Sequence, residues 1–67
     1  MSREAGVVAD FDSAVGLGHI ATDRGETKLF HCIEIADGSR TIDVGAQVSF
    51  VSVTRFGHAE ASDIQPA

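Results

Sequence analysis

The chain has 67 residues, of which ten are acidic and five basic, and its formal net charge is −5 at pH 7. A chain this short forms one small domain that buries about 60% of its unfolded surface. The acidic balance disfavours duplex nucleic acid, because cationic side chains supply most of the affinity for phosphates. One cysteine, Cys32, excludes an internal disulfide and favours a reducing compartment. With no apolar run that predicts a signal peptide or a membrane span, we expect a cytoplasmic domain without a membrane partner, metal or cofactor.

Short apolar runs rich in Val, Ile and Phe, separated by Gly, Asp and Ser, predict an all-β chain. In chain order, strands are expected near residues 5–12, 15–22, 28–33, 46–53 and 58–64. The turns between them are expected at residues 12–13, 23–25, 37–39 and 54–57. The residues after Ile64 are expected to form a loose tail that Pro66 closes off.

Five short strands cannot make two full sheets, but they can close a small barrel, which removes exposed strand edges. Strand alternation places Gly16, Gly18 and Ile20 on the inner face and Leu17 and His19 on the outer face. Glycine at the inner positions leaves room for a tightly coiled strand. The core is expected to consist of Val8, Ile20, Phe30, Ile35, Val48, Phe50 and Ile64.

The first two strands follow the pattern G-x-V-x-x-F-x-x-x-x-G-x-G-x-I, from Gly6 to Ile20. This pattern resembles the start of bacterial cold-shock proteins, whose first ribonucleoprotein motif reads approximately K-G-[FY]-G-F-I, against VGLGHI at 15–20. The segments KLFHC (28–32) and IDVGAQVSF (42–50) are similar to the family's V-F-V-H-F and L-x-E-G-Q-x-V-x-F. The resemblance, from about Gly6 to Pro66, implies one cold-shock-like domain over residues 1–67. It also implies a five-stranded antiparallel OB-type barrel at about 5–65.

Members of this family bind single-stranded RNA and DNA by stacking bases on aromatic side chains of strands two and three, with lysines around them. Phe11 and His31 keep the family's residue type. The aromatic or basic residue of the family is replaced at Ala9, Asp10, Val15, Leu17, His19, Leu29 and Cys32. Because stacking contributes about 1–3 kcal/mol per base, these replacements predict weak binding. The low sequence specificity is what the resemblance to this family implies.

The resemblance therefore implies weak binding of single-stranded RNA or DNA on the outer face of strands two and three. Bases would stack on Phe11, His19 and His31. Leu17 and Leu29 would pack against these bases. Lys28 and Arg55 would contact phosphates.

Several alternatives stay open at this point. Leu17 and Leu29 occupy matched outward positions, so the same face could instead contact a protein partner or a second copy of the chain. The histidines could be solvated residues without a role, or a metal- or proton-sensitive pair with Cys32 or His58. Phe56 could cap the barrel or replace a lost stacking residue. The sequence contains neither a nucleophile at a suitable spacing from a base nor a loop that could cradle phosphates, so nothing in it indicates an enzyme.

Overall fold

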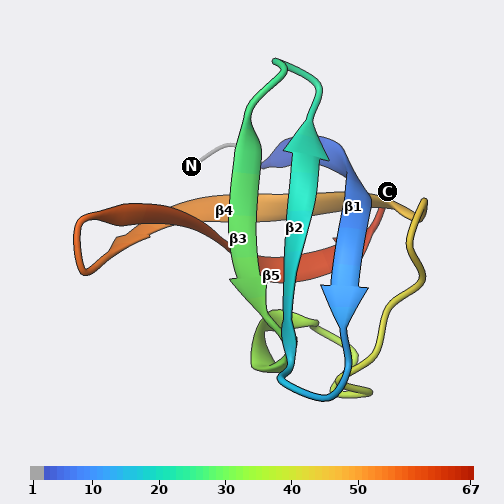
Figure 1. The fold of residues 1–67 in the computed structure, drawn as a ribbon. Coiled ribbons are helices and arrows are strands. Elements are labelled where there is room, and N and C mark those ends of the chain that lie inside the picture. Colours follow the sequence, from blue (N-terminus) through green and yellow to red (C-terminus); the bar gives the residue numbers. More distant parts are fainter. Residues whose placement is uncertain (1–2) are drawn as a thin grey trace.

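The computed structural model describes residues 3–67, so the first two residues of the predicted domain lie outside the described part. Its strands are β1 (Glu4–Asp12), β2 (Leu17–Thr22), β3 (Thr27–His31), β4 (Gln47–Arg55) and β5 (His58–Pro66), and a short 3₁₀ helix, η1 (Cys32–Glu34), follows β3. The strands form a closed barrel in the order β1-β2-β3-β5-β4 (Figure 1). The predicted all-β, five-stranded barrel is confirmed. Between residues 3 and 67, no helix has the length and apolar character needed to cross a membrane.

The pairing of the strands differs from a purely antiparallel barrel at one seam. Four neighbouring pairs are antiparallel, but β3 and β5 run parallel, with Leu29 beside Glu60. The reason is geometric, because a closed ring with an odd number of strands cannot alternate direction all the way round. One face of the barrel therefore consists of β1, β2 and β3 side by side, and the β4–β5 hairpin crosses behind them (Figure 1).

The core fills the interior of this barrel. Its buried apolar residues are Val8, Ile20, Phe30, Ile35, Val48, Phe50, Ala61 and Ile64. All seven predicted core residues are confirmed, and Ala61 is an addition. The inward position of Gly18 is also confirmed, because a Cβ atom there would lie 2.6 Å from the ring of Phe30 and 2.6 Å from the carbonyl oxygen of Asp10.

Three local expectations were wrong. Gly16 lies in the turn before β2 with φ of +73°, instead of facing inward from a strand, and its N–H donates to the Asp12 carbonyl at 2.8 Å. Cys32 begins η1 rather than continuing the third strand. The residues after Ile64 are not a loose tail, since Pro66 pairs with Val48 inside β5. The N–H of Ala67 also donates to the carbonyl of Gln47 at 3.0 Å.

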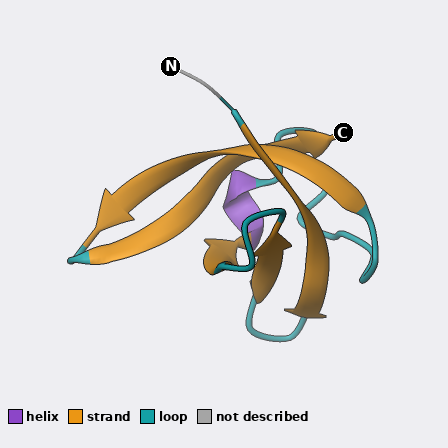
Figure 2. Ribbon diagram, turned by 90° about the horizontal axis from the view of Figure 1, so that it is seen from above, coloured by secondary structure: helices purple, strands orange, loops and turns teal. Residues whose placement is uncertain are grey.

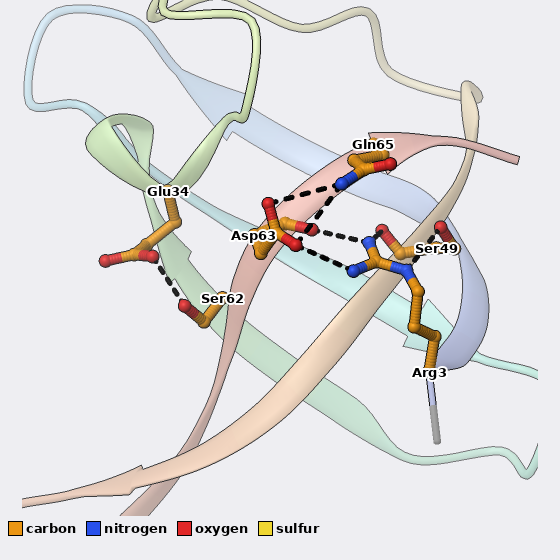
Figure 3. Close-up of polar contacts among 6 residues, drawn as sticks. All are labelled: Arg3, Glu34, Ser49, Ser62, Asp63 and Gln65. Atoms are coloured by element: carbon orange, nitrogen blue, oxygen red, sulfur yellow. Dashed lines mark hydrogen bonds and ion pairs between the residues drawn. The ribbon is translucent and has the colours of Figure 1, made fainter. Parts of the chain in front are cut away.

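The seam between β4 and β5 contains a bulge that side chains hold in place (Figure 3). Asp63 occupies the left-handed region with φ of +51°, opposite the register shift between Ser49 and Val51. The Arg3 guanidinium donates to the Asp63 carboxylate at 2.8 Å and to the Ser49 carbonyl at 2.9 Å. Hydrogen bonds from Gln65 and from Arg3 hold the pKa of Asp63 below its usual range. Arg3 therefore links the start of β1 to its neighbour β4 and to the next strand, β5.

Candidate nucleic-acid interface

The outer face of β2 and β3 carries a small alternating group of imidazole and leucine side chains. In the register of these strands, His19 lies opposite Leu29, and Leu17 lies opposite His31. All four side chains are partly exposed; those of His19 and His31 keep 45% and 44% of their surface. Like residues are therefore diagonal to each other, and each leucine is flanked by an imidazole ring. We call Leu17, His19, Leu29 and His31 the outer face.

His19 is oriented by a carboxylate of the neighbouring strand. Asp10 pairs with His19 across β1 and β2, and its carboxylate accepts a hydrogen bond from Nδ1 of His19 at 2.9 Å. When Nδ1 keeps its proton in this way, a neutral imidazole presents Nε2 as a hydrogen-bond acceptor toward solvent. The contact orients the ring and leaves a little under half of the side-chain surface open for stacking.

His31 lies at the edge of the outer face over a buried carboxylate. The Glu60 side chain is 7% exposed, and its Oε1 is 3.6 Å from Nε2 of His31 and 3.9 Å from Nη1 of Arg55. These are ion-pairing distances without a hydrogen bond, and Oε1 is a buried oxygen without a hydrogen-bond partner in residues 3–67. The Arg55 guanidinium is therefore the permanent positive charge that lies close to this buried oxygen.

Arg55 is engaged mainly by a second carboxylate, that of Glu34 in η1. Nη1 of Arg55 donates to Glu34 Oε2 at 3.0 Å, and the Ser62 hydroxyl donates to Glu34 Oε1 at 2.6 Å (Figure 3 shows the Ser62 contact). The hydrogen bond from Ser62 and the ion pair with Arg55 hold the pKa of Glu34 below its ordinary value of 4.5, against the opposing effect of burial. Glu34 therefore stays ionised at neutral pH and neutralises Arg55.

The comparisons with known proteins agree with this geometry. A family model described as the 'Cold-shock' DNA-binding domain matches residues 4–67. The chain belongs to the cold-shock domain family. The match confirms the resemblance to the cold-shock family that the sequence motifs indicate, and domains of this family generally bind nucleic acids.

A solved structure described as "drosophila Unr CSD456" is similar to this cold-shock domain, with a TM-score of 0.82 and 28% sequence identity. The match covers 98% of this chain and 27% of that chain, so the domain spans only a minor part of that protein. No curated protein matches the chain.

The cold-shock barrel separates the seven predicted site residues into two groups. It brings Leu17, His19, Leu29 and His31 together on the outer face. It does not bring the remaining three, Phe11, Lys28 and Arg55, onto that face. That these residues bind nucleic acid stays a prediction, and only their positions are described next.

Phe11 lies on the inner side of β1. It pairs with Gly18 and stacks on the core residue Phe30, with ring centroids 5.9 Å apart and an interplanar angle of 4°. The cause is a register shift between Val8 and Asp10, which adds one residue to β1 and reverses the alternation after it. The same bulge turns Asp10 outward toward His19.

Lys28 also points to the inner side of its strand. It pairs with the buried Ile20 and shares the face of Phe30, two residues later in β3. Its side chain is 12% exposed, and its ammonium lies 3.8 Å from the carboxylate of Glu26. Like Arg55, it has a carboxylate close to its charge, so neither is a free cation on the outer face.

Sequence reasoning missed the carboxylates that surround the histidines. Asp10 meets His19 only because of the bulge, and Glu60 meets His31 only because the barrel closes between β3 and β5. Neither event has a signal within the strands themselves. Cys32 packs against the core, and residues 3–67 contain no cluster of three or more His, Cys, Asp or Glu side chains that could hold a metal ion.

Proposed function

We propose that this cold-shock domain binds single-stranded RNA or DNA on the outer face of β2 and β3, weakly and with little sequence specificity. The observation that carries the proposal is the alternating arrangement of Leu17, His19, Leu29 and His31 on adjacent strands. Imidazole rings stack on unpaired bases, and the leucines add apolar contact on either side of each ring. Any base has a face for such contacts, so they carry little sequence information.

Two features explain why the proposed binding is weak. The outer face has two imidazoles and two leucines, and a leucine lacks the planar electron-rich surface on which a base stacks. The chain also has a net charge of −5, and Arg55 is already paired with Glu34, so neutralisation of phosphates adds little affinity.

The alternative of protein contact through the leucines gains no support from the strand register. Leu17 and Leu29 are diagonal to each other, and a histidine faces each one across the strands. A docking surface for a protein usually needs a contiguous apolar centre surrounded by polar contacts. The leucines of the outer face are instead interrupted by partly exposed imidazoles.

The test is an NMR titration of the labelled domain with a thymine-rich single-stranded heptamer, at low salt and pH 6.5. We expect saturable shifts at Leu17, His19, Leu29 and His31, and weaker binding by the Leu29→Ala variant. Val44→Ala serves as the matched control, because Val44 is 62% exposed in the turn before β4. Unshifted outer-face amides at millimolar oligonucleotide would contradict the proposal. Concentration-dependent sedimentation that Leu17→Asp abolishes would favour self-association instead.

A further inference from the structure

The tip of the β4–β5 hairpin holds an aromatic residue in a conformation that phenylalanine rarely adopts. Arg55 pairs with His58, so Phe56 and Gly57 are the two central residues of the turn, with φ of +51° and +79°. Two-residue hairpin turns with positive φ at both positions favour sequences such as Asn-Gly, because a bulky side chain is strained there. Phenylalanine at the first position of the turn is therefore expected to lower the stability of the fold.

Nothing in residues 3–67 compensates this strain by packing. Phe56 is 99% exposed, so it neither caps the barrel nor contributes to the core. By contrast Asp63, another non-glycine residue with positive φ, is held by Arg3 and Gln65. Strain that the fold does not use is a recognised mark of functional residues.

The hairpin carries this ring beyond the β3 edge of the outer face. β4 and β5 extend past β3 in both views of the barrel (Figures 1 and 2). Side chains also connect the outer face to the hairpin. His31, at the end of β3, and Arg55, next to Phe56, approach the same oxygen of Glu60, at 3.6 and 3.9 Å. A strand that crosses the outer face and leaves over His31 therefore runs toward the hairpin.

We propose that Phe56 is an additional base-stacking position, which engages the part of a bound single strand that runs past the β3 edge of the outer face. This inference rests on the proposed function. A ring with both faces exposed suits stacking between unpaired bases. A protein-binding hot spot needs surrounding contacts that exclude water. The neighbours of Phe56 in the turn are Arg55, Gly57 and His58. The other exposed large apolar residues of the described chain lie in other segments: Val7, Val15, Ile33 and Val44.

The contribution of Phe56 is stacking rather than charge attraction. The guanidinium beside it is held by Glu34 at 3.0 Å, so the hairpin does not offer a free cation to a phosphate. Removal of the ring should therefore lower affinity without changing the dependence of affinity on salt.

The experiment compares a thymine tetramer, which the outer face alone can hold, with a thymine nonamer, which extends past β3. The variant is Phe56→Asn, which creates the preferred Asn-Gly turn and so preserves the fold. We expect about tenfold weaker binding of the nonamer, unchanged binding of the tetramer, an unchanged salt slope and a higher melting temperature. Val44→Asn, at another exposed turn residue, is the matched control and should change neither affinity.

The outcomes separate this inference from the proposed function. If the wild-type domain binds neither oligonucleotide, the proposed function fails and the inference fails with it. If the wild type binds both and Leu29→Ala weakens both, the function stands. Equal nonamer affinities of Phe56→Asn and the wild type, or equal losses for both lengths, would then overturn the role of Phe56. Loss of self-association in Phe56→Asn, with intact nonamer binding, would identify the ring as a protein contact and would also overturn it.

Discussion

The two sides of strands β2 and β3 have opposite characters. The inner side, with Gly18, Ile20 and Phe30, is buried and packed so closely that a methyl group at Gly18 would touch the Phe30 ring. The outer side is half-open, and carboxylates lie next to both of its histidines. The inner residues pack the barrel, whereas the outer residues are partly exposed and contribute less to its stability. Substitutions on the two sides should therefore affect different properties, stability on the inner side and binding on the outer side.

The largest expected effect is the loss of stability caused by a substitution on the inner side of β3. Phe30→Ala should lower the free energy of unfolding by about 3–5 kcal/mol, because it removes buried surface and leaves a cavity. A domain of this size has roughly 3–10 kcal/mol in total, so much of the variant should be unfolded at room temperature. Urea unfolding followed by circular dichroism measures this. Leu29→Ala, one residue earlier on the other side, should cost about 1 kcal/mol, and equal losses would contradict the comparison.

The role of the outer side in binding can be tested by placing aromatic rings on it. The double variant Leu17→Phe, Leu29→Phe should bind a thymine heptamer about tenfold more tightly for each ring, because each adds a stacking surface. Fluorescence anisotropy with a labelled heptamer gives the affinities. The control is Leu17→Met, Leu29→Met, which keeps an apolar side chain without a ring. An equal gain in the control would show that apolar contact, not stacking, limits the affinity.

A smaller effect is expected at the β4–β5 seam, where polar contacts stabilise the barrel instead of facing a ligand. Arg3→Ala should lower the free energy of unfolding by about 1 kcal/mol, since it removes a partly exposed set of charge-assisted hydrogen bonds. It should leave oligonucleotide affinity unchanged. Arg24→Ala, at an exposed residue of the β2–β3 turn, is the control and should be neutral. A loss of binding without a loss of stability would place Arg3 in the interface.

The smallest effect concerns the pH dependence of stability through Glu34. Its pKa is lowered in the folded state, so its contribution is complete above the ordinary value of 4.5 and is lost as the pH falls through the folded pKa. As the pH is lowered from about 5, the Glu34→Gln variant should therefore lose less stability than the wild type. Ser62→Ala should be intermediate, because it removes the largest cause of the shift. Urea midpoints over a pH series test this, and parallel curves would contradict it.

Strand alternation was sufficient to predict the barrel and its interior from the sequence. The core residues lie in short apolar runs bounded by turn residues, and within the run at 46–53 the inward pair Val48 and Phe50 follows the two-residue period of a strand. The prediction was wrong where the chain departs from the two-residue alternation of a β-strand. The glycine of the first turn, Gly16, was assigned to a strand because its left-handed backbone leaves no trace in an apolar pattern.

The candidate site was less predictable because it depends on contacts between distant strands. One extra residue in β1 moved Phe11 inward and Asp10 outward, which no local pattern announces. Glu60 reached His31 only through closure of the barrel. Lys28 was a different case, since its position two residues before the predicted core residue Phe30 already placed it on the inner side.

The odd number of strands has a consequence for the mobility of the domain. The parallel seam between β3 and β5 consists of a single register pair, Leu29 with Glu60, supplemented by a bridge between Ile35 and Ile64. Few backbone hydrogen bonds therefore protect β3 on this side, and its amides should exchange with deuterium earlier than those shared by β1 and β2. When the seam opens, β3 becomes an unprotected edge, which is the position from which β proteins exchange strands or aggregate.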